Sequence, residues 1–209
     1  MGILKALNWR YATKSFDPAA VLEKEQISLL KEAFNLTPTS YGLQPLKLLV
    51  ISDKTLQEKL LPASFNQKQV STASHVFVLC IEKKIDSTFI KNHFELIKEI
   101  RDTPDKILEP YRDFLLKDFS EKNDEQLRQW SKNQAYLALG NMLTVCAIEK
   151  IDACPMEGFL PNEYAKLLEL DKWNIEPVLV LPVGHRHKDD QFSSMKKVRR
   201  PLKEVVIDY

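Results

Sequence analysis

The sequence contains little glycine and cysteine and no long apolar run. Its five glycines form no G-x-G-x-x-G or P-loop sequence, so the common backbone cradles for nucleotide phosphates are excluded. The three cysteines lie far apart among apolar residues, and we expect reduced, buried thiols rather than a disulfide framework or a zinc site. Because no stretch could span a bilayer and the N-terminus has no signal-peptide core, we expect a soluble, cytoplasmic protein with no membrane partner.

Neither sign of charge dominates the chain. It has 30 Lys and Arg against 29 Asp and Glu, so its overall field would not hold a nucleic acid. The 209 residues include no internal repeat and no Gly-rich linker. The chain is long enough to bury a sizeable core, and we expect a single domain over residues 1–209.

Hydrophobic periodicity predicts a mixture of helices and strands. Residues 75–81 are almost continuously apolar, which is typical of a strand buried on both faces. In a long helix at 124–150, residues 135–147 are apolar nearly all round, so we expect them to be buried. Their small side chains would suit a dimer axis, or equally a buried helix inside a monomer. We also expect helices at 23–34, 56–61, 86–122 (with breaks at Pro104 and Pro110) and 162–170, and strands at 46–51, within 151–159, at 177–184 and at 205–207.

Two basic runs at opposite ends of the chain suggest a site for an anion. Arg10 and Lys14 are four residues apart, with small and hydroxyl residues between them, and residues 196–201 form a second run without an acidic residue. If the fold brings the two runs together, they would bind a phosphate group. The alternative is that Arg10 and Lys14 are an ordinary solvated charge pair.

Two loops have the composition of ligand-binding segments. Residues 37–45 are rich in hydroxyls and amides, although they could simply connect two elements. In the second loop Glu157 precedes Gly158, and a glycine permits close approach of the backbone to a flat ligand or merely makes a turn. His185 and His187 have no acidic or cysteine ligand set nearby in the sequence, so we expect no metal site.

Four segments, taken in order, resemble the FMN-dependent nitroreductase family. They are the run RYATKSFD from Arg10, the run PTS from Pro38 followed by Gln44-Pro45, the run PMEGF from Pro155, and the run KVR from Lys197. The sequence is most similar to the branch of oxygen-insensitive NAD(P)H nitroreductases and dihydropteridine reductases. Each motif alone is weak, but four in the right order make a specific signal that covers nearly the whole chain.

The resemblance implies an α+β fold, with a mixed sheet flanked by helices and a C-terminal strand exchanged within a homodimer. Two FMN molecules would lie at the dimer interface, with NAD(P)H as the electron-donating co-substrate. Arg10, Lys197 and Arg199 would hold the FMN phosphate. Tyr11 and Ala12 would also contact the cofactor, Ala12 through its backbone only.

The resemblance also assigns residues to the flavin ring. Lys14, Asn66 and Gln69 would lie at its polar edge, and one face would be covered by Pro155, Met156, Glu157 and Gly158. Lys14 and Glu157 are the expected catalytic residues. The other subunit would supply Pro38, Thr39, Ser40 and Gly42, and Tyr41 would lie on the substrate side.

The chain departs from the family pattern at three positions. Ala12 stands where many relatives have serine, Tyr41 replaces a smaller residue, and Gln69 stands where a second lysine is usual at the flavin edge. The register around Asn66 and Gln69 could differ by one residue, which would make Lys68 the edge cation instead.

The implied activity is the transfer of two electrons from NAD(P)H through FMN to nitroaromatic, quinone or similar small acceptors by a ping-pong mechanism. An alternative is a dihydropteridine or flavin reductase on the same fold. A further alternative is a non-catalytic binding module whose basic tail contacts nucleic acid or acidic lipid, which the near-neutral net charge disfavours.

Overall fold

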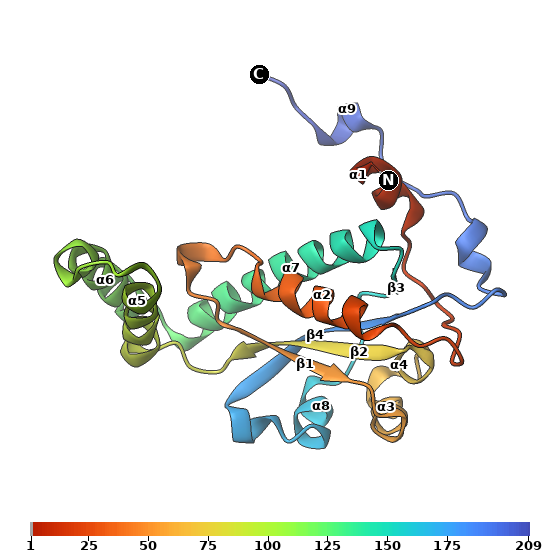
Figure 1. Ribbon diagram of the computed structural model, residues 1–209, viewed down its shortest axis with the longest axis horizontal. Coiled ribbons are helices and arrows are strands. Elements are labelled where there is room, and N and C mark those ends of the chain that lie inside the picture. Colours follow the sequence, from red (N-terminus) through yellow and green to blue (C-terminus); the bar gives the residue numbers. More distant parts are fainter. Residues whose placement is uncertain (1) are drawn as a thin grey trace.

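The computed structural model describes residues 2–209 and has two helical layers around a small central sheet (Figure 1). Four strands lie in the order β1-β2-β4-β3, and each neighbouring pair is antiparallel. A parallel bridge from Ala12 to Ala153 adds the N-terminal segment to the β3 edge. The expected α+β fold is confirmed, and this bridge is what makes the sheet mixed. The strands are β1 (Leu46–Ile51), β2 (His75–Glu82), β3 (Asp152–Ala153) and β4 (Ile175–Gly184).

The helices follow the predicted ranges closely in most of the chain. They are α1 (Ile3–Trp9), α2 (Lys24–Asn35), α3 (Lys54–Leu60), α4 (Gln69–Thr72), α5 (Ser87–Arg101), α6 (Asp105–Ser120), α7 (Asp124–Ile148), α8 (Pro161–Leu167) and α9 (Leu202–Val205), with 3-10 turns η1 (Ser40–Gly42), η2 (Pro62–Ser64), η3 (Leu170–Trp173) and η4 (Gln191–Ser194). No helix of the described residues is both long and apolar enough to cross a bilayer.

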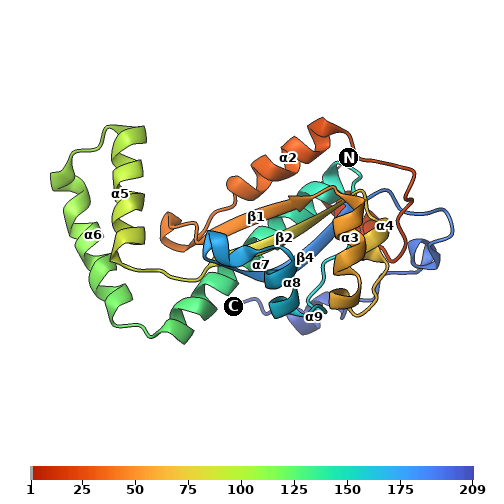
Figure 2. The same cartoon turned by 90° about the horizontal axis from the view of Figure 1, so that it is seen from below.

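Strand β2 separates the two main cores. Its side chains alternate, so that Val76 and Val78 join α3, α4 and α8 on one face, while Phe77 and Leu79 meet α2 and α7 on the other. Both layers are visible in Figures 1 and 2. A third cluster holds α5 and α6 together as a hairpin that extends beyond the sheet (Figure 2).

Two predicted features of the helices are wrong. Helix α6 continues through Pro110, because this residue lies on the exposed side, where water can satisfy the carbonyl freed by the missing N–H. Residues 135–147 of α7 are not buried all round. Ala135 and Ala138 pack inside the monomer, whereas Tyr136, Leu137 and Gly140 are exposed.

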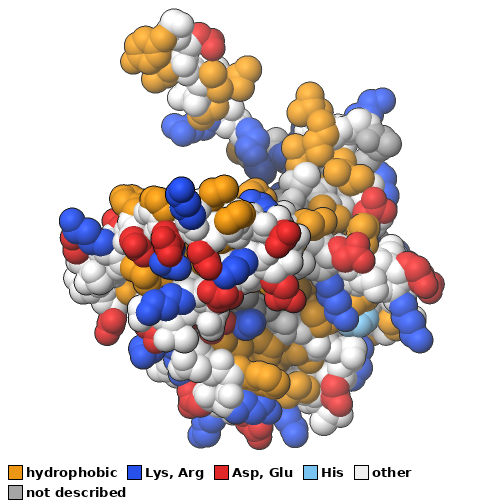
Figure 3. All heavy atoms as spheres, turned by 60° about the vertical axis from the view of Figure 1, so that its left-hand side comes forward, with side chains coloured by type: hydrophobic (Ala, Val, Ile, Leu, Met, Phe, Trp, Pro, Cys, Tyr) orange, Lys and Arg blue, Asp and Glu red, His pale blue; other side chains and the backbone are white. Residues whose placement is uncertain are grey.

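The C-terminal tail forms no strand within the chain. A short helix covers Leu202–Val205, and Val206 and Ile207 follow as exposed residues. Figures 1 and 3 show the tail standing away from the body with apolar side chains on its surface. A strand needs a neighbouring edge to pair its backbone groups, and the tail pairs with no strand among the described residues. Exchange of this segment in a dimer stays a prediction.

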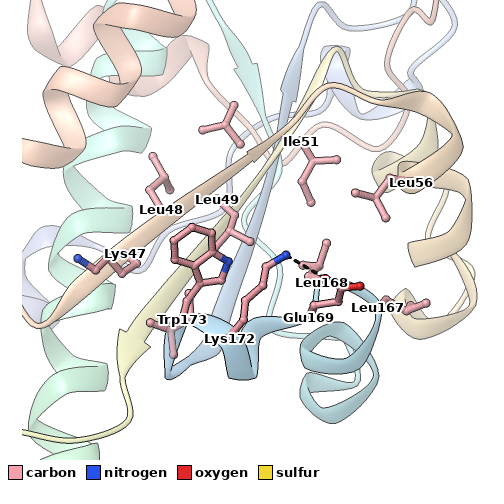
Figure 4. A pocket seen from close by; sticks show the side chains of 12 residues that line it. Lys47, Leu48, Leu49, Ile51, Leu56, Leu167, Leu168, Glu169, Lys172 and Trp173 are labelled. Atoms are coloured by element: carbon pink, nitrogen blue, oxygen red, sulfur yellow. Dashed lines mark hydrogen bonds and ion pairs between the residues drawn. The ribbon is translucent and has the colours of Figure 1, made fainter.

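An apolar groove runs beside the free edge of the sheet. It has a volume of about 590 Å³ and lies between β1 and the segment from α8 through η3 to the start of β4. Figure 4 shows Leu49, Ile51 and Leu56 on one side and Trp173 on the other. Because β1 is the outer strand, one row of its N–H and C=O groups faces this region without a strand partner in the described chain.

Candidate active site

The two basic runs meet in one cavity. Its volume is about 420 Å³, and its walls come from residues 8–14 and 192–199. The Lys197 ammonium donates a hydrogen bond to the Arg10 carbonyl, which ties the walls together across 187 positions of sequence. Five of the lining residues are cationic, namely Arg10, Lys14, Lys196, Lys197 and Arg199.

The electrostatics of this cavity favour an anion. Burial and the nearby Arg199 lower the pKa of Arg10, and burial, Arg10 and Arg199 lower the pKa of Lys197. The described lining includes no aspartate or glutamate. Cations that destabilise one another and have no carboxylate partner would gain from a bound phosphate. The residues present therefore fit the phosphate end of a nucleotide-like cofactor such as FMN.

The N-terminal wall is held by a stacked arginine. The Arg186 guanidinium lies 4.4 Å from the Trp9 ring and 4.6 Å from the Tyr11 ring, and its Nε donates to Asp152 at 2.8 Å. Tyr11 and Ala12 are extended, because the bridge to Ala153 draws this segment onto the sheet. Trp9, the last residue of α1, and Tyr11 both stack on Arg186, and the extended Arg10 lies between them in the chain.

A second polar group lies where the cavity passes toward β3. The Lys14 ammonium and the Gln69 amide converge on the sulfur of Cys154, at 4.0 and 3.9 Å. Burial raises the pKa of Cys154, and the nearby Lys14 only partly offsets this, so the thiol is neutral. Gln69 is 6% exposed, whereas Lys68 faces solvent. Between Lys68 and Gln69, the two candidates for the flavin edge, Gln69 is thus the one that lies beside Lys14.

The segment from Pro155 to Gly158 follows directly after Cys154. Met156 is buried, and its N–H donates to the Val180 carbonyl at 2.8 Å, which fixes the segment to β4. The Gly158 carbonyl accepts a hydrogen bond from the Gln67 amide at 2.8 Å. Glu157 is exposed and adjoins Tyr136 on α7, whose pKa is raised by burial and by this carboxylate.

One aromatic residue near this segment was missed by the sequence analysis. Phe65 is 59% exposed, and its ring lies within 3.7 Å of the position that a Cβ on Gly158 would occupy. Phe65 and Asn66 both have positive φ angles, of 52° and 56°, which turn the chain sharply between η2 and α4. The available signal was a lone aromatic residue in a polar run, which periodicity does not distinguish from a core residue.

The loop from Pro38 to Gly42 is not part of the basic cavity. The Ser40 N–H donates to the Gln134 side chain at 2.8 Å, in the first half of α7. Arg10 instead lies near Cys146. Burial raises the pKa of the Cys146 thiol, and the charge of Arg10 partly offsets this rise. Residues 134 and 146 are about 18 Å apart along a helix. Figure 1 places this orange loop and α1 toward opposite ends of α7.

Tyr41 packs within this loop region. Its φ of 60° is unusual for a residue other than glycine. Its ring contacts Phe119 edge-on at 5.7 Å and Trp130 at 6.3 Å. The neighbouring Gly42 also has a positive φ, of 72°, and lies beside His93. The expected partner-subunit and substrate residues are therefore gathered at one end of α7, away from the cations.

Comparisons with known proteins agree with this geometry. The model of the Nitroreductase family matches residues 7–185. A protein of Staphylococcus haemolyticus that carries the name NAD(P)H nitroreductase is 32% identical over 98% of this chain and 95% of its own length. Two crystal structures share the fold. A Bacillus subtilis nitroreductase has a TM-score of 0.86 and 20% identity, with 98% of this chain and 97% of that chain covered. An Exiguobacterium sibiricum nitroreductase in complex with FMN has a TM-score of 0.84 and 21% identity, with 100% of this chain and 98% of that chain covered. The chain belongs to the nitroreductase family.

Proposed function

We propose that this protein holds FMN and uses it to carry two electrons from NAD(P)H to small acceptors such as nitroaromatics and quinones. The observation that carries the proposal is the cavity in which cations from both ends of the chain meet without a carboxylate. Lys14, which lines the same cavity, converges with Gln69 on Cys154, an arrangement that would suit a cofactor with a phosphate at one end and a polar ring edge at the other.

The residues have distinct roles in this proposal. Arg10, Lys197 and Arg199 bind the phosphate. Lys14 and Gln69 hydrogen-bond the polar edge of the ring, and Asn66 lies in the turn next to it. Pro155, Met156, Glu157 and Gly158 cover one ring face, and the strand-like bonds of Met156 keep that surface fixed.

The chemistry depends mainly on charge and position. Bound FMN supplies the hydride chemistry, which no side chain of the protein could provide. The Lys14 ammonium stabilises negative charge that develops at the polar edge of the ring. No side-chain general base is needed if water supplies the protons to the acceptor. Donor and acceptor then use the same site in turn, as a ping-pong mechanism requires.

A homodimer would complete the site. The loop from Pro38 to Gly42 is bonded to the buried Gln134 of α7 and does not line the basic cavity of its own chain, so it would serve the cavity of a second copy. Tyr136, Leu137, Gly140 and Ile148 form an exposed stripe along α7, and Tyr136 at its N-terminal end adjoins Glu157. Pairing through this α7 stripe would bring the two copies together at the ring end of the site.

The tail would fasten the dimer. Val205, Val206 and Ile207 are exposed, and β1 offers an unpaired edge beside an apolar groove. The tail of one copy could add a strand to that edge in the other copy, which would pair its backbone groups and bury its side chains.

Stopped-flow spectroscopy under anaerobic conditions tests the proposed function. The protein, reconstituted with FMN, is mixed with NADH or NADPH alone, and the reduced protein is then mixed with a nitroaromatic compound or a quinone. We expect the flavin absorption band to disappear in the first step and return in the second. Absence of a bound flavin band would contradict the cofactor, and reduction that requires donor and acceptor together would contradict the ping-pong order.

A further inference from the structure

Asp190 is a buried carboxylate that joins two backbone segments. Its side chain is 3% exposed. Oδ2 accepts hydrogen bonds from the N–H groups of Lys14 at 2.8 Å and Ser15 at 3.0 Å, and Oδ1 accepts one from Phe192 at 3.0 Å. Burial would raise the pKa of Asp190, but these backbone donors together lower it, so the group is ionised at neutral pH.

The donors belong to opposite walls of the basic cavity. Lys14 ends the N-terminal wall, and Phe192 begins the C-terminal wall that leads to Lys197 and Arg199. A single side chain thus fixes the two walls at one end, while the bond from Lys197 to the Arg10 carbonyl closes the other. The geometry of the cations depends on both connections.

Through its charge alone, Asp190 would weaken the binding of a phosphate rather than support it. A carboxylate beside a cationic cavity repels a bound phosphate, so removal of its charge would strengthen phosphate binding. An asparagine has nearly the same shape but only one acceptor oxygen, and its NH₂ group would face backbone donors that need an acceptor. The replacement of Asp190 by asparagine therefore distinguishes the two roles. FMN binding should become tighter if only the charge matters, and weaker if the position of the walls matters.

We propose that Asp190 is a positioning residue, which holds the two walls of the cavity at the spacing that a flavin phosphate requires. The inference rests on the proposed binding of FMN. The proposal predicts that Asp190 affects the binding of the two flavins differently. Asp190 should matter for FMN, which carries the phosphate, and matter little for riboflavin, which has the same ring without it.

The experiment compares the affinities of the apoprotein for FMN and riboflavin by fluorescence quenching. Asp190→Asn should weaken FMN binding about tenfold, the equivalent of about 1.4 kcal/mol, and change riboflavin affinity less than about twofold. Asp189→Asn is the matched control. Asp189 is the exposed neighbour, 3.6 Å from His187, and its replacement makes the same charge change, so FMN affinity should be unchanged or slightly higher.

Asp190→Ser is measured in parallel, because a serine can still accept from Phe192 while losing the bonds to Lys14 and Ser15. Thermal melts of each apoprotein establish that the variants fold. Tighter or unchanged FMN binding in a folded variant, an equal loss for both flavins, or failure of both variants to fold would overturn the positioning role. A wild-type protein that binds neither flavin would instead overturn the proposed function, and this inference with it.

Discussion

The two ends of helix α7 carry opposite kinds of surface. Near Cys146, cations from both ends of the chain enclose a polar cavity that one copy builds by itself. Near Gln134, the loop with Tyr41 lies against aromatic rings of α6 and α7. The cationic end has the chemistry to hold a phosphate, and the aromatic end has the chemistry to contact flat apolar molecules.

In the proposed dimer, this difference would divide the binding contacts between the two copies. Phosphate binding needs only contacts within a chain, since Lys197 and Asp190 already join the two cavity walls. In the proposed dimer the substrate side would come from a neighbour, because the loop at Ser40 does not line the cavity of its own chain. We therefore expect some variants to impair cofactor retention alone and others to impair assembly.

The largest effect is expected from Leu137→Glu in the α7 stripe. Leu137 is 54% exposed, so the single chain should fold normally, but a buried and unpaired carboxylate at the proposed dimer interface would cost about 3–5 kcal/mol. Light scattering at micromolar concentration should show a monomer, and activity with NAD(P)H should be lost. Leu96→Glu on α5, where the leucine is 46% exposed, is the control. A Leu137→Glu protein that stays dimeric would refute the interface.

Arg199→Ala should impair the cationic end without changing assembly. Loss of a charge-assisted hydrogen bond to phosphate costs about 1.5–3 kcal/mol, which corresponds to roughly tenfold to a hundredfold weaker FMN binding. Equilibrium titration with FMN measures this, and light scattering should still show a dimer. Arg200→Ala is the matched control, because Arg200 does not line the cavity. Equal affinities for the Arg199→Ala and wild-type proteins would rule out the phosphate site.

The smallest effect is expected from Gln69→Lys, at the point where Gln69 and Lys14 converge on Cys154. A second cation beside Lys14 should stabilise the reduced, anionic flavin and raise its two-electron midpoint potential. At about 5 Å and an effective dielectric near 20, one charge contributes roughly 3 kcal/mol before screening, an upper limit of about 70 mV.

Burial of the new ammonium and the presence of Lys14 should reduce the shift to a few tens of millivolts. Potentiometry of the bound FMN measures it, and Lys68→Gln is the control, since Lys68 faces solvent. A potential that falls in Lys68→Gln and stays constant in Gln69→Lys would show that the edge cation is Lys68.

The sequence predicted most elements because their signals are local. The bounds of β1 were predicted correctly, and those of β2 and α7 to within one or two residues, from apolar runs and periodicity. The errors occurred where context overrides a local rule. Pro110 interrupts a hydrogen bond of an exposed helix without ending it, and residues 205–207 have strand-like composition but lie beside no strand edge of their own chain.

The candidate site divides in the same way. The order of four motifs in the sequence was enough to identify the family and to name Arg10, Lys197 and Arg199, because residue types and their spacing are properties of the chain itself. Only the tertiary structure places Gln69 rather than Lys68 toward Lys14, separates the loop at Ser40 from the cations, and distinguishes Asp190 from its neighbour Asp189. Adjacent carboxylates look alike in a sequence, and burial against backbone donors more than 170 residues away depends on the complete fold.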